Sequence, residues 1–173
     1  MVAAVADEAG ARFKRAPRFI RAEIAETGPG EPPLLLALPL AFMNESGSPV
    51  AALLRYFKPG RLLVVHDDID LPFAKLRLHH GRGAGGHNGV ASLIRSLGDT
   101  AFWRLKVGVG RPPGRMDPAD FVLRRFAKRE RTDMDLVVSE AAAVVRCFAA
   151  DGEDAARQLA GDSYRRLFGG IAD

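Results

Sequence analysis

The sequence predicts a single α/β domain over residues 1–173, with a mixed, largely parallel sheet flanked by helices. The first reason is that segments with strand periodicity alternate with segments of helical periodicity along the chain. The second is the run Leu62–Val65, which is apolar at every position, as in a strand covered on both faces. The third is length, because 173 residues fit one domain and the chain has no internal repeat or long linker.

Composition narrows the class of protein further. Hydrophobic residues make up 47% of the chain, which is typical of a globular protein and not of a disordered one. No apolar run approaches the roughly 20 residues that cross a bilayer, and Met1–Glu8 lacks the basic start of a secretory signal. Cys147 is the single cysteine, which excludes an internal disulfide or a zinc site built of thiolates. We therefore expect a cytoplasmic protein that does not enter the membrane.

The charge balance leaves two interpretations open. The formal net charge is +4 and the pI is about 9.6, which favours an anionic partner such as a nucleic acid. A solvated basic surface without a partner explains the same totals equally well. The positions of the basic residues in the fold are therefore more informative about a partner than the net charge.

The elements of the first half follow from periodicity and from turn residues. Val2–Ala9 is an amphipathic segment that predicts a helix ending at Gly10, without a residue that could cap its start. Phe19–Glu26 alternates as a half-buried strand does, and Leu34–Leu38 is a short apolar strand after a glycine turn. Val50–Phe57 carries one apolar helical stripe, which Pro59 and Gly60 stop.

The second half continues the alternation of strands and helices. After the buried strand Leu62–Val65, we expect a strand over Leu76–Leu78 and a helix that begins in a glycine loop and ends at Gly98. Arg104–Val109 alternates again and predicts another strand. Two further helices are expected, a short one over Pro118–Leu123 and a long one from about Thr132 to Ala150.

Three polar segments follow strands of the predicted sheet. They are Phe42–Gly47, His66–Pro72 and the glycine loop Gly83–Gly89. In open α/β sheets, ligands gather beyond the carboxyl ends of the strands, so we expect these segments to meet there.

Each segment taken singly also has a structural interpretation. Asp67, Asp68 and Asp70 fit a solvated turn, or carboxylates for Mg²⁺ or Ca²⁺. The glycine loop fits any phosphate at a helix start, although its spacing is neither that of a Walker loop nor that of a dinucleotide fold. Asn44 and Asn88 are residues that commonly stabilise turns. Taken singly, these motifs therefore do not identify a function.

Taken together and in this order, the three segments resemble the signature stretches of the bacterial-type peptidyl-tRNA hydrolases. The likeness continues through Trp103–Pro112 and into Pro118–Leu123, which matches the lid segment of that family. It implies hydrolysis of the ester bond between peptide and tRNA in peptidyl-tRNA released from the ribosome. It also implies a cytoplasmic monomer that uses neither a metal nor an organic cofactor, with tRNA as its partner.

The resemblance assigns roles to individual residues. Asp67 matches the catalytic aspartate, which orients and stabilises a histidine that acts as general base on water. Other matched positions bind the substrate, and these are Phe42, Met43, Asn44 and Asn88. A third group matches the clamp on the tRNA phosphates, and it comprises Lys75, Arg77, Arg104 and Lys106. The family more often has arginine at Lys106, so bidentate geometry is lost there while the charge is kept. The basic residues from Arg124 to Arg131 are interpreted as a solvated helix face.

One part of the family pattern does not occur in these residues. The family begins with a buried strand, a glycine loop and a Thr-Arg-His-Asn motif that carries the general base, and the sequence contains no such motif. The four histidines present, His66, His79, His80 and His87, are not expected to replace it.

Three explanations stay open for this difference. The start codon is assigned too far downstream, the chain is a fragment, or the protein is a non-catalytic RNA- or protein-binding relative of the same fold. The opening helix without a cap favours the first two, with the first strand missing from the sheet. A weaker alternative from another class is a phosphate-binding hydrolase of small nucleotides.

Overall fold

The structure is a computed structural model that describes residues 1–169. The described chain divides into two compact units, each built from more than one stretch of sequence. The N-terminal unit holds Val2–Leu63 and His80–Trp103, and the C-terminal unit holds Met1, Val64–His79 and the chain from Arg104 onward.

The N-terminal unit combines a small antiparallel sheet with helices. Its elements are α1 (Val2–Glu8), β1 (Lys14–Arg15), β2 (Ala22–Glu26), β3 (Leu35–Pro39), the 3₁₀ turn η1 (Met43–Glu45), α2 (Gly47–Phe57) and α3 (Asn88–Leu97). The strand order is β1-β2-β3, and Ile24 lies opposite Lys14 on one side and Ala37 on the other. Ala16, Ile20 and Leu53 pack with Ile24 in a hydrophobic cluster that joins the sheet to α2.

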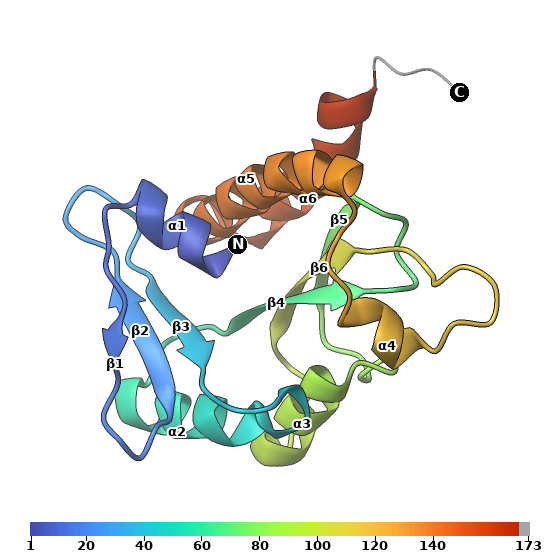
Figure 1. Ribbon diagram of the computed structural model, residues 1–173. Helices are drawn as coiled ribbons and strands as arrows, with labels where there is room; N and C mark the ends of the chain where they lie inside the picture. Colours follow the sequence, from blue (N-terminus) through green and yellow to red (C-terminus); the bar gives the residue numbers. More distant parts are fainter. Residues whose placement is uncertain (170–173) are drawn as a thin grey trace. The chain divides into compact units, whose positions relative to one another are not determined.

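α2 and α3 lie side by side, and the start of α2 approaches the middle of α3 closely (Figure 1). The amide N–H of Gly47 donates a hydrogen bond of 3.0 Å to Oγ of the buried Ser92. A Cβ at Gly47 would overlap the backbone carbonyl of Ser92, so the position requires glycine. Because η1 immediately precedes α2, this contact also holds η1 beside α3.

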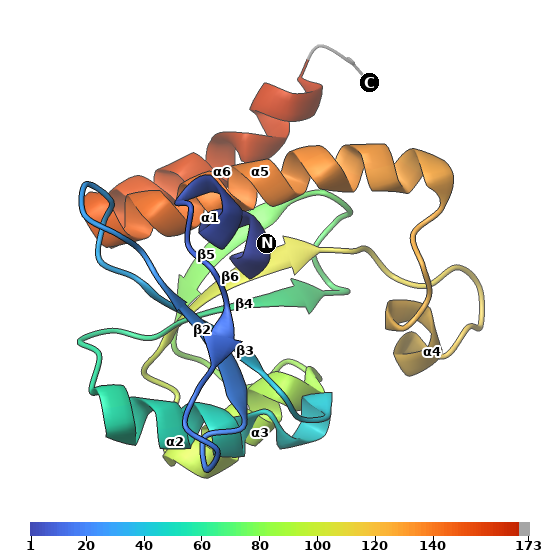
Figure 2. The same ribbon diagram turned by 60° about the vertical axis from the view of Figure 1, so that its left-hand side comes forward.

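The C-terminal unit is a three-stranded sheet with a helical hairpin. Its elements are β4 (Leu63–Asp68), β5 (Leu76–His80), β6 (Trp103–Gly108), α4 (Pro118–Val122), α5 (Lys128–Ala150) and α6 (Glu153–Phe168). The strand order is β4-β6-β5. Figure 2 shows α5 and α6 lying over one face of this sheet, and α5 buries an apolar stripe that includes Val137, Val144 and Phe148.

Backbone hydrogen bonds determine the strand directions in this sheet. The amide of Trp103 bonds to the carbonyl of Leu62 and that of Val109 to the carbonyl of Asp68, so β4 and β6 run parallel. Gly108 bonds to the carbonyl of Lys75 at one end of β5, and Gly81 bonds to the carbonyl of Phe102 at the other. β5 therefore runs antiparallel to β6, and the sheet is mixed.

The α/β class is confirmed, but the strands are arranged differently from the prediction. The sequence predicted one largely parallel sheet, whereas residues 1–169 form two three-stranded sheets with β4–β6 as the parallel pair. The predicted strand Phe19–Glu26 begins only at Ala22, because Arg21 adopts a left-handed φ of 54°. The helix α6 was not predicted at all. The prediction of one domain over 1–173 stays a prediction, and its last four residues lie outside the described part.

The described residues include no helix that is both long and apolar enough to cross a membrane.

Two glycines on helices test the close packing of α2 against α3. We expect Gly47→Ala to destabilise the protein by about 1 to 3 kcal/mol, because the added methyl group forces α2 away from Ser92. Gly161→Ala on α6 is the matched control, since a Cβ there meets nothing within 4 Å. It should stabilise the protein by about 0.5 to 1 kcal/mol through helix propensity. Chemical denaturation measures both, and equal effects of the two changes would contradict the packing argument.

Candidate functional site

An exposed apolar and amide surface forms around η1 in the N-terminal unit. Phe42 is 79% exposed and Met43 is 57% exposed, which is unusual for side chains of their size. The turn is closed by the amide of Glu45, which donates a 2.8 Å hydrogen bond to the carbonyl of Phe42. Asn44 is exposed in the same turn.

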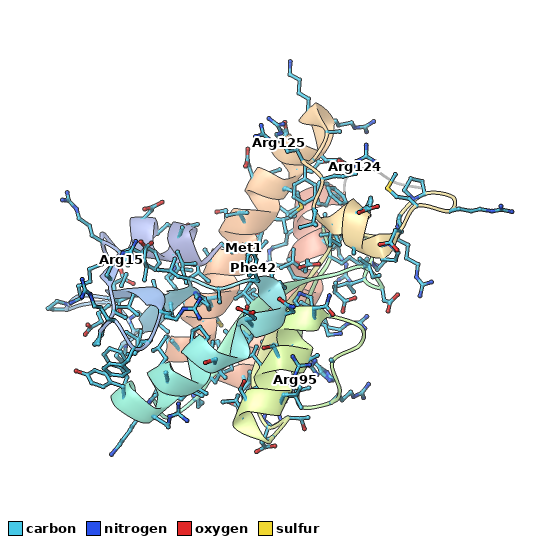
Figure 3. All side chains as sticks on the ribbon, turned by 60° about the horizontal axis from the view of Figure 1, so that its bottom comes forward. Met1, Arg15, Phe42, Arg95, Arg124 and Arg125 are labelled. Carbon is cyan, nitrogen blue, oxygen red and sulfur yellow. The ribbon has the colours of Figure 1, made fainter. Side chains whose placement is uncertain are left out.

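The start of α3 lies next to this turn. The sulfur of Met43 is 2.5 Å from the place that a Cβ on Gly89 would occupy, so the thioether rests directly on the glycine backbone. Nη2 of Arg95, two turns along α3, donates a 3.3 Å hydrogen bond to the backbone carbonyl of Asn44. Figure 3 labels Arg95 on α3 and Phe42 at the start of η1. Asn88 is the first residue of α3 and is exposed. The four residues predicted to bind substrate are therefore gathered at one place.

Sequence reasoning did not single out Arg95. The signal was present in its spacing, because Arg95 follows Asn88 by seven residues and therefore shares its helix face.

The glycine loop Gly83–Gly89 leads into the N-terminus of α3, which lies beside η1. Gly85 and Gly86 both adopt positive φ, at 58° and 81°, which allows the chain to turn sharply before the helix. His87 is the N-cap, and its Nδ1 accepts a 3.2 Å hydrogen bond from the amide of Val90. The first amides of a helix carry partial positive charge, so a developing negative charge is stabilised near this end.

The acidic segment covers the last two residues of β4 and the turn that follows, in the C-terminal unit. Asp67 is half-buried, and its backbone carbonyl accepts a 2.6 Å hydrogen bond from Nδ1 of His66. Asp68 binds Nζ of Lys106 through Oδ2 at 2.6 Å and accepts the amide of Asp70 through Oδ1 at 2.8 Å. The three carboxylates therefore differ in their surroundings, although they lie within four residues of each other.

The charge state of Asp68 is set by competing effects. Burial by itself raises the pKa of its carboxyl, whereas the hydrogen bonds from Lys106 and from the Asp70 amide lower it, and the positive charges of Lys106 and His66 lower it further. The outcome is a pKa below the ordinary value for aspartate. Asp68 is thus held ionised and acts as a structural partner of Lys106.

The predicted phosphate-binding residues share one face of the β4-β6-β5 sheet. Because Gly108 pairs with Lys75 and Phe102 with Gly81, the antiparallel register places Lys106 opposite Arg77 and Arg104 opposite His79. Side chains alternate between faces, so Lys75 and Arg77 lie on the same side as Lys106 and Arg104.

The four basic residues nevertheless differ in accessibility. Arg77 is exposed, and Lys75 is exposed with Nζ 5.2 Å from the ring centre of Tyr164 on α6. The side chain of Lys106 is 25% exposed and already pairs with Asp68. Arg104 is only 1% exposed, so its position does not fit direct contact with a phosphate, and burial favours a structural role for it.

Three of the four histidines have structural surroundings. His87 caps α3, His80 packs on Trp103 with ring centres 4.7 Å apart, and Nε2 of His66 is buried. The expectation that none of the histidines is the general base stays a prediction. Residues 1–169 also contain no group of three or more His, Cys, Asp or Glu side chains suited to a metal ion.

An α/β protein with exposed side-chain amides beside a helix start in one unit and exposed cations on a strand of the other has groups suited to a reaction on an anionic substrate. The sequence profile described as peptidyl-tRNA hydrolase matches residues 1–166, so the chain belongs to the peptidyl-tRNA hydrolase family. A relative named peptidyl-tRNA hydrolase from Kineococcus radiotolerans is 48% identical over 141 residues, covering 80% of this chain and 71% of the relative. One from Frankia casuarinae is 46% identical over 155 residues, covering 88% and 78%.

Solved structures agree with the family. The crystal structure of peptidyl-tRNA hydrolase from Acinetobacter baumannii superposes with a TM-score of 0.84 at 26% identity. The match covers 92% of this chain and 82% of that one. The predicted α/β fold and the family resemblance are thereby confirmed.

The pairing of Asp68 with Lys106 predicts a pH-dependent contribution to stability. Because the folded-state pKa of Asp68 lies below its unfolded value, the contribution is complete above about pH 4 and is lost as pH falls through the folded-state pKa. Asp68→Asn should destabilise the protein by about 1 to 3 kcal/mol at pH 7 and by progressively less toward pH 3. Denaturant unfolding across this pH range measures the difference.

Asparagine keeps the acceptor for the Asp70 amide, so the substitution isolates the bond to Lys106. Asp70→Asn is the control, because the ion pair of Asp70 with Arg111 is well exposed at both side chains and should contribute less than about 1 kcal/mol. A pH-independent effect of Asp68→Asn would contradict the assignment.

Proposed function

We propose that this protein hydrolyses the ester bond between the peptide and the tRNA in peptidyl-tRNA released from the ribosome, and so returns the tRNA to use. The observation that supports this most directly is the gathering of Phe42, Met43 and Asn44 against Asn88 at the start of α3, in a chain of the peptidyl-tRNA hydrolase family.

The chemistry required is modest. Water attacks the ester carbonyl, a tetrahedral oxyanion forms, and the bond to the ribose oxygen breaks to release the peptide carboxylate and the tRNA hydroxyl. Side-chain amides of Asn44 and Asn88, together with the first amides of α3, are donors suited to the ester oxygen as it becomes negative. Phe42 and Met43 offer an apolar wall for the aminoacyl end of the peptide.

Asp67 is the proposed catalytic carboxylate. In the family scheme it orients and stabilises a histidine base, and its place near the end of β4 puts it on a rigid element. The histidine of that scheme belongs to a motif that these 173 residues do not contain. With His87 engaged as a cap and Nε2 of His66 buried, we assign the base role to neither.

The tRNA backbone is proposed to lie along the exposed cations of β5. Lys75 and Arg77 are the main phosphate contacts, and Lys106 adds charge from the neighbouring strand while it stays paired with Asp68. Arg104 is left out of direct contact because it is buried. We further propose that the protein acts as a monomer in the cytoplasm, and sedimentation in the absence of tRNA tests the first of these two statements.

Activity tests the role of Asp67 together with that of the absent histidine motif. We expect the 173 residues alone to release peptide slowly from an N-blocked aminoacyl-tRNA. Joining a family segment with the strand and the Thr-Arg-His-Asn motif ahead of Met1 should raise the rate by about 10² to 10⁴, the typical contribution of a positioned base. Asp67→Asn in that longer chain should remove most of the gain.

Asp70→Asn is the matched control in the longer chain, because it makes the same chemical change in an exposed ion pair three residues away. It should leave the rate nearly unchanged. Robust turnover by the 173 residues alone would refute the expectation and place the base among the four histidines present, to be identified by alanine replacement.

Binding of tRNA tests the proposed clamp. The affinity should fall steeply with salt, and Lys75→Ala or Arg77→Ala should each reduce the slope of log affinity against log salt by about 1. Arg104→Ala should instead lower the free energy of unfolding, with little change in slope, because the side chain is buried. Arg165→Ala on α6, where the side chain is 84% exposed, is the control. Slopes that all four variants leave unchanged would mean that β5 is only a solvated face.

A further inference from the structure

A second surface of unusual composition lies in the N-terminal unit, at the far end of α2. Phe19 is 66% exposed and Tyr56 is 55% exposed, and their rings meet edge to face with centres 5.6 Å apart. Two aromatic side chains that lie together in solvent leave apolar area uncovered, which a stable fold normally avoids.

Basic residues flank the two aromatic residues in the sequence, and the same stretches contain no acidic residue. Residues 9–22 and 46–66 contain eight lysines and arginines and no aspartate or glutamate. Four exposed cations lie within two positions of these residues along the chain, Arg18 and Arg21 beside Phe19, and Arg55 and Lys58 beside Tyr56. We call Phe19, Tyr56 and these four cations the basic-aromatic patch. The ion pair between Lys14 and Glu26, at 3.6 Å, joins β1 to β2 and involves none of the patch cations.

The backbone holds the patch in place. The amide of Ile20 bonds to the carbonyl of Pro17 at 2.8 Å, which forms the turn that carries Phe19. The buried side chain of Ile20 packs with Leu53 of α2, so the turn is attached to the helix that carries Tyr56. The two aromatic residues therefore come from segments that the hydrophobic cluster joins.

Two patch cations occupy positions where glycine would be more favourable. Lys58 ends α2 with a left-handed φ of 48°, and Arg21 has a φ of 54°. Side chains other than glycine, asparagine and aspartate adopt this conformation at an energetic cost, and glycine is the usual residue at such a helix end. The chain thus has long cationic side chains at two positions where the backbone conformation disfavours them. A role of these cations in binding would explain why they are present.

We propose that the basic-aromatic patch is a second RNA-binding surface, which takes a single-stranded or unstacked segment of RNA. Exposed aromatic rings stack on unpaired bases, and arginine and lysine around them neutralise the phosphates. The four exposed cations of the patch favour a polyanion over an apolar protein partner.

The patch is separate from the substrate surface of the same unit. α2 runs from Gly47, beside η1, to Tyr56 near its other end, and a rise of about 1.5 Å per residue separates these ends by about 14 Å. The inference does not rest on ester hydrolysis, because the patch contains none of the residues proposed for that reaction.

Binding of two RNA probes to the full chain tests the proposal. The probes are a single-stranded oligoribonucleotide of about 16 nucleotides, the upper end of a typical single-strand site, and a duplex of the same length. Phe19→Ala should weaken binding of the single strand by about 5-fold or more and leave duplex affinity unchanged, because paired bases cannot stack on the ring.

Lys58→Gly provides a variant that cannot fail through misfolding. Glycine suits the left-handed conformation, so the melting temperature should stay the same or rise, while the salt slope for the single strand should fall by about 1. Arg165→Gln on α6 removes the same charge elsewhere and should leave the slope unchanged.

Unchanged binding in Phe19→Ala and Lys58→Gly would overturn the proposal. So would equal losses in Arg165→Gln, which would indicate a response to total charge alone. A self-association in sedimentation that Phe19→Ala abolishes, with RNA binding intact, would assign the patch to contact between copies of the chain and would also overturn it.

Discussion

The contact between the backbones of α2 and α3 is the constraint on which the substrate surface depends. Gly47 lies so close to Ser92 that any side chain at position 47 would push the two helices apart. Because η1 enters α2 directly and Asn88 begins α3, the distance between the two asparagines is decided by this single approach. The thioether of Met43 on Gly89 repeats the same arrangement one turn away, again at a position where a side chain would interfere.

In the C-terminal unit, the main constraint on the sheet is the repulsion between its basic side chains. The register of β5 against β6 brings cations together on one sheet face, where their mutual repulsion disfavours the folded state. Asp68 offsets part of this through its bond to Lys106, and the ring of Tyr164 does the same for Lys75. The charges left most open to solvent are those of Lys75 and Arg77, on the strand where a polyanion would add the missing counter-charge.

α2 connects two exposed surfaces of the N-terminal unit, the one around η1 and the basic-aromatic patch. At its start, a turn presents apolar and amide groups beside the positive end of a helix, and at its end, two aromatic rings lie among cations. Both surfaces expose large side chains, and both are held by glycine or left-handed backbone positions that tertiary contacts support. An RNA substrate whose reacting end occupies one surface has further length to reach the other.

The sequence by itself determined the class of fold, the family and the identity of the polar segments, since periodicity and local motifs carry this information without knowledge of long-range contacts. Helix α3 behind its glycine loop and the strands before the Asp67 and Phe42 segments were predictable for this reason. Tertiary structure alone decided which predicted residues are accessible. Arg104 and Arg77 have the same chemistry and lie on the same sheet face, yet packing buries one and leaves the other in solvent. It also decided that Phe19 meets Tyr56 and that Arg95 reaches Asn44, because contacts between residues tens of positions apart arise from helix packing that no local pattern encodes.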